Sequence, residues 1–135
     1  MHSKKQVRDL MSRPVKTLER NDLLSVADSA MRNERIRHLP VLDNGRLVGI
    51  VSQRDLFLSA LVRALGHGTM ALRLIVVKEV MTEDVVTTTP ETPIAAAAQM
   101  MVDRKIGCLP VVEGNALVGI LSESDIVSAV ARGDF

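Results

Sequence analysis

Two serine–aspartate pairs are the side chains in this sequence best suited to hold a ligand. Ser52 and Asp55 follow one apolar run, and Ser122 and Asp125 follow a similar run in the second half of the chain. An ionised carboxylate offers two acceptor oxygens, which suits the two neighbouring hydroxyls of a ribose. A serine hydroxyl beside a helix N-terminus could face a phosphate or the edge of the sugar. The pairs could therefore bind a nucleoside or nucleotide.

The same spacing, Ser-x-x-Asp, is also that of a helix capping box. In that role both side chains only satisfy free backbone N–H groups where a helix begins. The spacing alone favours this structural interpretation because caps are common. Under either interpretation, Ser52 and Ser122 lie where a strand ends and a helix starts.

A basic cluster accompanies the first pair. Arg37 and His38 precede an apolar strand, and Arg54 lies inside the first Ser-x-x-Asp motif. Guanidinium groups suit phosphate, so these residues form a candidate polyphosphate site, although exposed and solvated side chains would give the same pattern. The corresponding residues of the second half carry no charge: Gly107, Cys108 and Ser124. Residues 1–70 hold 12 basic and 7 acidic side chains, against 5 and 9 in residues 71–135, so the first half better suits an anion.

The elements that position these residues come from an internal duplication. A constant shift of seventy residues maps Met11 to Met81 and Met31 to Met101, with no insertion or deletion over residues 7–56. Each copy is too small for a deep core alone, so the copies are expected to pack together and to form two related clefts between them.

Each copy is expected to contain, in order, a strand, a helix, two strands and a helix. For the first copy we expect a strand at 15–18, a helix at 23–33, strands at 39–42 and 47–51, and a helix from 52 to about 65. For the second we expect a strand at 85–88, a helix at 94–104, strands at 109–112 and 117–121, and a helix from 123. Short helical leads at 6–11 and 77–81 precede the copies. Asn21 or Asp22 and Thr92 are the expected caps, and Asp43-Asn44-Gly45 is a hairpin turn signal.

The fold class is therefore α/β (α+β), with two β-α-β-β-α repeats related by approximate two-fold symmetry. We place the repeats at residues 6–65 and 77–131, joined by a linker at 66–76 that Gly66-His67-Gly68 opens.

The pattern Gly-apolar-x-Ser-x-x-Asp at 49–55 and 119–125, each preceded by apolar-Pro-Val, resembles the cystathionine-β-synthase (CBS) domain. Two copies in tandem resemble a CBS pair, or Bateman module, over roughly residues 6 to 131. The resemblance implies that the copies bind AMP, ADP, ATP or a related adenosyl ligand in clefts between them. It also implies a regulatory protein that is not itself an enzyme. The family's phosphate contacts usually run His then Arg, an order that is reversed at Arg37 and His38.

The resemblance extends the candidate ligand contacts beyond the motif. Asp55 and Asp125 would hold the ribose, with Ser52 and Ser122 beside it, while Arg37, His38 and Arg54 would serve phosphate in either one of the two clefts. The remaining candidates approach the base or line the adenine: Thr17, Thr87, Ile36, Ile106, Pro40 and Pro110. Strand preference explains the two threonines equally well, and core packing explains the apolar residues about as well.

Composition argues against several other classes of protein. Two Phe and no Trp or Tyr offer few stacking platforms, which argues against binding of single-stranded nucleic acid. One cysteine excludes an internal disulfide and indicates a reducing, cytoplasmic setting. No apolar run approaches the ~20 residues of a membrane span, and no signal region follows the N-terminus. Neither a metal-ligand cluster nor a catalytic triad order is present, so we expect no metal, no cofactor and no enzyme activity.

We therefore expect a regulatory module that binds an adenosyl ligand and signals energy or metabolite state to an unidentified protein. The signal would be a conformational change passed to that partner or within a homo-oligomer. The resemblance implies a flat homodimer formed through helices, and the aliphatic runs 56–65 and 94–101 could supply its face. The alternative is a protein-interaction or dimerisation module with no ligand, in which the serines and aspartates are only caps.

Overall fold

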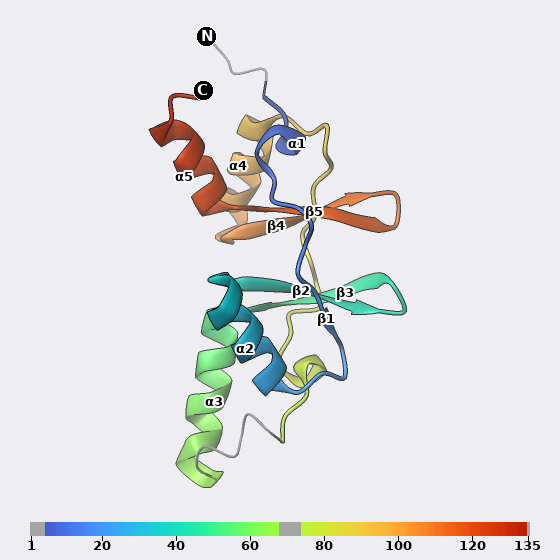
Figure 1. The fold of residues 1–135 in the computed structure, drawn as a ribbon, viewed down its shortest axis with the longest axis vertical. Helices are drawn as coiled ribbons and strands as arrows, with labels where there is room; N and C mark the ends of the chain where they lie inside the picture. Colours follow the sequence, from blue (N-terminus) through green and yellow to red (C-terminus); the bar gives the residue numbers. More distant parts are fainter. Residues whose placement is uncertain (1–4, 68–73, 135) are drawn as a thin grey trace. The chain divides into compact units, whose positions relative to one another are not determined.

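The computed structural model describes residues 5–67 and 74–134. The chain folds into two compact units that do not coincide with the two sequence repeats. The central unit is Lys16–Val85, and the C-terminal unit combines Met1–Val15 with Val86–Phe135. Helices and strands are mixed in both units, which confirms the α/β class (Figure 1).

The central unit is built around a three-stranded sheet of order β1-β2-β3. Its elements are β1 (Leu18–Glu19), α2 (Leu24–Glu34), β2 (His38–Asp43), β3 (Arg46–Ser52), α3 (Gln53–His67) and the 3-10 helix η2 (Val77–Glu79). β1 is parallel to β2, and β2 is antiparallel to β3. The outer edge of β3 is also covered, because Ile50 and Thr82 exchange two backbone hydrogen bonds of 3.0 and 2.9 Å.

The C-terminal unit repeats this plan around the hairpin β4–β5. Its elements are α1 (Val7–Leu10), α4 (Ile94–Arg104), β4 (Cys108–Glu113), β5 (Ala116–Ser122) and α5 (Glu123–Ala131). Thr88 pairs in parallel with Val111 on one edge. On the other edge, Ser12 and Ile120 exchange backbone hydrogen bonds of 2.9 and 3.1 Å. The hairpins β2–β3 and β4–β5 therefore each have a backbone pairing partner along both edges.

The two sequence repeats exchange their lead segments, which we define as residues 7–15 and 77–85. Val7, in the lead of the first repeat, is fully buried in a core with Ile94 and Leu109 of the second. Val77, in the lead of the second repeat, is fully buried with residues of the first, such as Leu39. Figure 1 shows the blue α1 beside the orange and red elements of the C-terminal unit.

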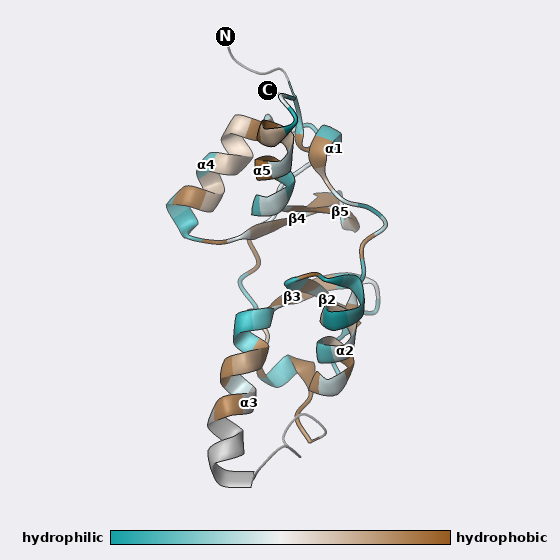
Figure 2. Ribbon diagram, turned by 60° about the vertical axis from the view of Figure 1, so that its left-hand side comes forward, coloured by the Kyte–Doolittle hydropathy of each residue, from teal (hydrophilic) through white to brown (hydrophobic). Residues whose placement is uncertain are grey.

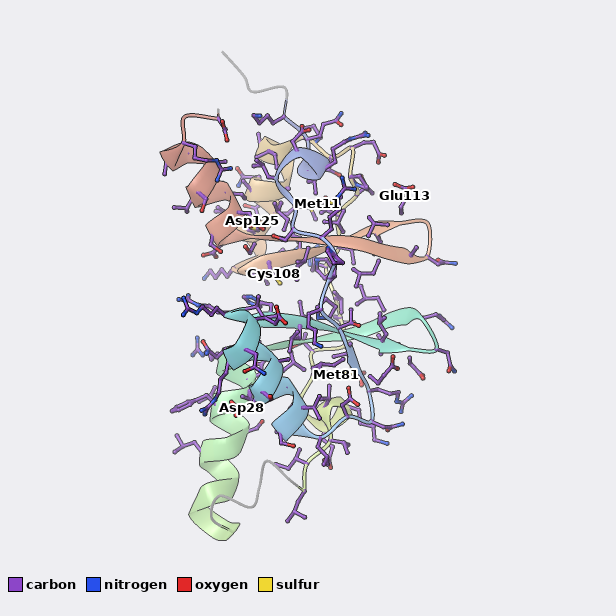
Figure 3. All side chains as sticks on the ribbon, viewed as in Figure 1. Met11, Asp28, Met81, Cys108, Glu113 and Asp125 are labelled. Carbon is purple, nitrogen blue, oxygen red and sulfur yellow. The ribbon has the colours of Figure 1, made fainter. Side chains whose placement is uncertain are left out.

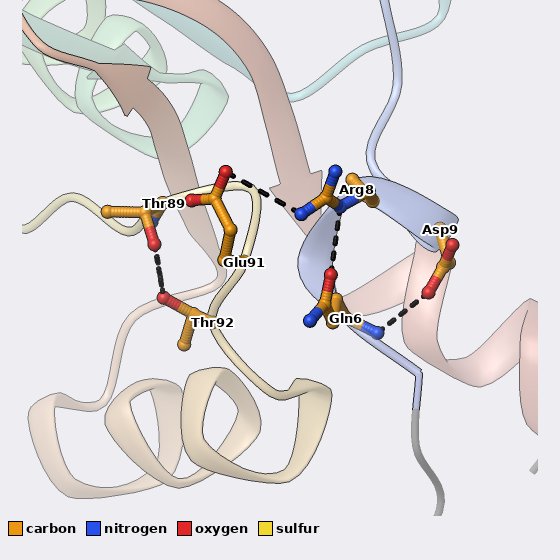
Figure 4. Close-up of polar contacts among 6 residues, drawn as sticks. All are labelled: Gln6, Arg8, Asp9, Thr89, Glu91 and Thr92. Carbon is orange, nitrogen blue, oxygen red and sulfur yellow. Dashed lines mark hydrogen bonds and ion pairs between the residues drawn. The ribbon is translucent and has the colours of Figure 1, made fainter.

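Polar contacts fix the first lead to the loop that precedes α4 (Figure 4). Arg8 forms an ion pair with Glu91 at 3.6 Å and donates from Nε to Gln6 at 2.8 Å. The backbone N–H of Val7 donates to the carbonyl of Thr92 at 2.8 Å. The side chains of Arg8 and Glu91 are exposed, so the burial of Val7, and not the ion pair, holds the segment in place.

The hairpin turn predicted between β2 and β3 is confirmed. Asn44 and Gly45 both have positive φ angles, 51° and 80°, which a two-residue hairpin turn requires and which Asn and Gly tolerate best. β2 and β4 pair with the following strand in equivalent registers, from His38 opposite Ser52 and from Cys108 opposite Ser122.

The expected caps are wrong. α2 begins at Leu24 after Leu23, without a side-chain cap, because Asp22 instead accepts from the backbone N–H of Glu19 at 2.8 Å. α4 begins at Ile94 after Pro93, since Thr92 accepts from Thr89 in the preceding turn. In both places a local turn competes successfully for the capping oxygen.

Other boundaries differ by a few residues. The first strand is shorter than predicted and lies at Leu18–Glu19, and its counterpart in the second repeat is a single bridge at Thr88. α3 continues through Gly66 to His67. Residues 68–73 of the predicted linker lie outside the described residues. No described helix has both the length and the apolar character needed to cross a membrane.

Candidate functional site

The strand–helix junction of the central unit holds the three predicted basic residues and the first serine–aspartate pair. His38, at the start of β2, is the register partner of Ser52 at the end of β3. The backbone N–H of Gln53 donates to the carbonyl of Arg37 at 2.7 Å. We call this group (Arg37, His38, Ser52, Arg54 and Asp55) the central junction. The predicted phosphate cluster thus lies on the same unit as Asp55.

The C-terminal unit has an equivalent junction with different side chains. Cys108 is opposite Ser122, and the backbone N–H of Glu123 donates to the carbonyl of Gly107 at 3.0 Å. Figure 3 shows the labelled Cys108 and Asp125 at the end of the β4–β5 hairpin where α5 begins. We call this group (Gly107, Cys108, Ser122, Glu123, Ser124 and Asp125) the C-terminal junction.

Both serine–aspartate pairs form the capping box. In the central junction, the backbone N–H of Ser52 donates to Asp55 Oδ2 at 3.1 Å, and the N–H of Asp55 donates to Ser52 Oγ at 3.0 Å. The corresponding distances for Ser122 and Asp125 are 2.8 and 3.3 Å. Helix capping, the structural interpretation of the Ser-x-x-Asp spacing, is therefore confirmed at both junctions.

Capping leaves acceptor capacity on each carboxylate. The cap uses Oδ2, and within residues 5–67 and 74–134 no hydrogen bond reaches Oδ1 of Asp55. Each carboxylate oxygen can accept more than one bond. Asp55 is half-buried at the first turn of α3, so its second oxygen can meet a ligand while the first holds the helix start. Capping and ligand binding are compatible roles.

Ser12 is a contact of Asp125 that is not among the residues predicted from the sequence. Its hydroxyl donates to Asp125 Oδ1 at 3.3 Å, from the lead segment that crosses β5. The corresponding residue of the second lead is Thr82, so a hydroxyl follows the lead methionine in both repeats. The repeated hydroxyl could be seen in the sequence. Its position beside the aspartate could not, because each lead contacts the other repeat.

The remaining predicted ligand residues lie in or beside the strands and cores, and their contact with a ligand stays a prediction. Pro40 and Pro110 are buried within the hairpin strands, while Ile36 and Ile106 pack against the two cores. Thr17 and Thr87 are half-buried and directly precede Leu18 and Thr88, which pair with Val41 and Val111. Among the residues that the structure describes, no polar contact joins these threonines to the junctions.

The motif glycines Gly49 and Gly119 make room for the lead segments. A Cβ built on Gly49 would lie 2.5 Å from Met81 Sδ and 3.1 Å from the carbonyl oxygen of Thr82. On Gly119 it would lie 2.6 Å from Met11 Sδ. Figure 3 labels both methionines. These glycines therefore serve the close approach of the leads.

Cys108 is a poor nucleophile where it stands. Burial, and secondarily the negative charge of Glu123, raises the pKa of its thiol to about 12. Thiolate is the reactive form of cysteine, and at neutral pH it is scarce because the pKa is raised. We expect a thiol reagent such as iodoacetamide to label the native protein slowly at pH 7.5 and the urea-unfolded protein quickly, as read by intact mass. Equal labelling rates would contradict the burial of the thiol.

A separate cavity lies in the C-terminal unit, away from the predicted ligand residues. It has a volume of about 510 Å³ and is lined by Arg8, Asp9, Met11, Arg13, Pro90, Glu113 and Val118. Its wall carries two guanidinium groups and two carboxylates, so it favours neither charge sign. Over the part of the chain that the structure describes, no group of three His, Cys, Asp or Glu side chains could hold a metal ion.

The fold and the two junctions define a class of protein: a tandem-repeat α/β module in which each repeat ends its hairpin in a capped Ser-x-x-Asp helix start. The chain belongs to the CBS domain family, whose model matches residues 7–61 and 77–132. The two matches form a tandem CBS pair.

Relatives of known name agree with this assignment. The CBS domain-containing protein YhcV of Bacillus subtilis is 31% identical over 120 residues, which cover 89% of this chain and 81% of that protein. The homoserine O-acetyltransferase of Methanococcoides burtonii is 38% identical over 122 residues, but this chain spans only 23% of its length.

A solved structure shows the same architecture. The CBS domain pair of protein MJ0100, crystallised with 5′-methylthioadenosine and S-adenosyl-L-methionine, is 29% identical, with a TM-score of 0.80. The match covers 97% of this chain and 98% of that one. The predicted family and fold class are thereby confirmed.

Proposed function

We propose that this protein is a regulatory module that binds an adenine nucleotide (AMP, ADP or ATP) or a related adenosyl compound. The observation that carries the proposal is the central junction, where Asp55 caps α3 through Oδ2, no hydrogen bond from the described residues reaches its Oδ1, and His38 is the register partner of Ser52. The carboxylate suits a ribose diol, and the cations suit phosphate. The structurally similar pair of MJ0100 was crystallised with two adenosyl compounds, which supports the ligand class.

A regulatory role, and not a catalytic one, fits the comparisons best. YhcV is named only for its CBS domains. The acetyltransferases match this chain over about a quarter of their length, so their chemistry need not reside in the matching part. We propose no cofactor besides this ligand. We place the module in the cytoplasm, where adenine nucleotides are available.

The output of the module would be a change in conformation. A ligand shifts a conformational equilibrium only by its differential affinity for the two states. The recipient is a regulated protein or a second copy of the chain. For a homodimer, α3 supplies Phe57, Leu58 and Leu61, whose exposed fractions are 65%, 46% and 49%; Figure 2 shows brown, apolar segments on this helix. The other predicted face is used internally, because Ile94, Ala97 and Met101 of α4 are buried in the core.

Asp55→Ala should weaken binding of AMP or ATP at least tenfold, because the ribose loses its acceptor. Isothermal titration measures the loss. The substitution also removes a cap contact, which costs about 1 kcal/mol of stability. Glu79→Ala is the matched control, since Glu79 likewise accepts from a backbone N–H, that of Val76 at 3.0 Å, in the same unit. The control should bind nucleotide as the wild type does.

A thermal-unfolding measurement with and without ligand separates the proposal from its alternative. A ligand at 100 times its dissociation constant should stabilise the wild type by about 2.7 kcal/mol, visible as a rise in melting temperature. If no adenosyl compound shifts the melting temperature at millimolar concentration, the caps and the exposed apolar residues of α3 favour an interaction or dimerisation module without a ligand.

A further inference from the structure

We propose that the cavity of the C-terminal unit is a second ligand site, separate from the serine–aspartate pairs. Its ligand is a small molecule that carries both a cationic and an anionic group, of the class of a free amino acid with a guanidinium side chain. The two sequence repeats differ at this place, because the first fills it with its own arginine and the second leaves it open. The site is independent of the adenosyl ligand.

Pro90 holds the position in the second repeat that Arg20 holds in the first, seventy residues earlier. The backbone contacts around the two residues are equivalent. The N–H of Lys78, in the second lead, donates to the carbonyl of Arg20 at 2.9 Å. The N–H of Arg8, in the first lead, donates to the carbonyl of Pro90, also at 2.9 Å. The two places therefore differ in their side chains and not in their backbone.

An ion pair occupies the place in the central unit. Arg20 Nη1 donates to Asp43 Oδ2 at 3.1 Å. The Nε of the same guanidinium is buried, so this side chain lies partly within the unit and not on its surface. Asp43 is the last residue of β2. The first repeat thus supplies a cation to the carboxylate at this strand end.

The C-terminal unit lacks that cation. Glu113 ends β4 at the position of Asp43, but its neighbours at the equivalent places are Pro90 and, across the hairpin, Ala116. Among the described residues, no ion pair includes Glu113. Glu113 and Pro90 instead line the cavity of about 510 Å³ with Met11, which Figure 3 labels together with Glu113. The volume is that of a small-molecule site, and the carboxylate suits a guanidinium or ammonium group.

The same cavity wall carries a cation without a partner. Arg13 lines the cavity from the first lead, where the second lead has the acidic Glu83. No ion pair within residues 5–67 and 74–134 includes Arg13. A guanidinium can hold a carboxylate through two parallel N–H groups.

The other two charged residues of the wall are already engaged. Arg8 pairs with Glu91 at 3.6 Å and donates to Gln6 at 2.8 Å (Figure 4). Asp9 Oδ2 accepts from the backbone N–H of Gln6 at 2.8 Å. The charges left for a ligand are therefore one carboxylate and one guanidinium, which a zwitterion satisfies together.

A titration of the whole chain with L-arginine, followed by two-dimensional ¹H–¹⁵N NMR, tests the site. The amides of Arg13 and Glu113 should shift and saturate at millimolar L-arginine, since both side chains are exposed and each contact contributes modestly. L-Citrulline has a neutral group in place of the guanidinium, and agmatine lacks the carboxylate. Each should bind at least about fivefold more weakly than L-arginine, because each loses one charge-assisted contact.

Pro90→Arg should abolish L-arginine binding, because it supplies Glu113 with a guanidinium from the position that Arg20 has in the first repeat. Pro90→Ala is the matched control, since it removes the ring without adding a cation and should bind L-arginine as the wild type does. Glu113→Gln and Arg13→Gln should each weaken binding at least about fivefold. None of these substitutions should change the affinity for AMP.

Three results would overturn the proposal. The first is the absence of a saturable shift in the wild type, whatever the protein does with AMP. The second is equal binding of L-arginine, L-citrulline and agmatine. The third is unchanged L-arginine binding by Pro90→Arg protein. The same spectra report whether that variant is folded, and if it is not, unchanged binding by Glu113→Gln protein overturns the proposal in its place.

Discussion

Val77→Asp should unfold the central unit, which contains the sheet of the first sequence repeat. The amides of the C-terminal unit should stay protected from exchange. Val77 belongs by sequence to the second repeat, yet it is fully buried in a core that includes Leu24 and Leu39. An unpaired carboxylate cannot be hydrated there, so we expect a loss of about 4 kcal/mol or more in the stability of the central unit. The effect should be the largest of any single substitution considered.

Hydrogen exchange read by mass spectrometry locates the damage. Amides of β2, β3 and α2 should lose protection, while those of β4 and β5 should keep it. Lys78→Asp is the matched control, because it adds an acidic residue at the next position, which is exposed. The reciprocal variant, Val7→Asp, should expose the amides of β4 and β5 instead. Loss of protection in β4 and β5 of the Val77→Asp protein would contradict the exchange of leads.

Gly49→Ala should destabilise the protein by about 1–3 kcal/mol, the usual cost of overpacking a filled site. The added methyl would lie 2.5 Å from Met81 Sδ and 3.1 Å from a backbone oxygen, so both the side chain and the lead must shift. Urea unfolding gives the change in free energy. Ala116→Val, at an exposed position of β5, adds carbon without a neighbour to displace and should cost under about 0.5 kcal/mol.

A double-mutant cycle identifies the lead as the cause. Met81→Ala removes the side chain that the new methyl meets, so Gly49→Ala should cost at least 1 kcal/mol less in that background. Additive effects would mean that Gly49 is required for another reason, such as its own backbone conformation. Gly119 and Met11 should behave as the equivalent pair, since the same contact recurs at 2.6 Å.

Together these contacts give the repeated motif two functions. Gly49 and Gly119 admit the leads, while Asp55 and Asp125 cap the helix starts, and the proposed ligand contact would use the same aspartates. A substitution in the motif can therefore alter stability, ligand affinity or both, and only measurements with and without ligand separate them.

The sequence alone predicted the parts that depend on local interactions. The turn at Asn44-Gly45 followed from residues that tolerate positive φ, and the position of Ser52 and Asp55 at a helix start followed from capping chemistry. The duplication with its seventy-residue shift predicted that the second junction would match the first, as the register of Cys108 with Ser122 shows. The expected caps at Asp22 and Thr92 failed because nearby N–H groups in turns compete for the same oxygens.

Sequence by itself thus determined the family, the two junctions and the difference in their charge, because motif, turn and composition are written in neighbouring residues. Only the tertiary structure decided that each lead joins the other repeat, that Ser12 meets Asp125, and that the motif glycines face methionines. The reason is physical: Val7 and Val77 are apolar residues that either core could bury. Hydrophobic burial has no direction, so their own sequence does not state which core they enter.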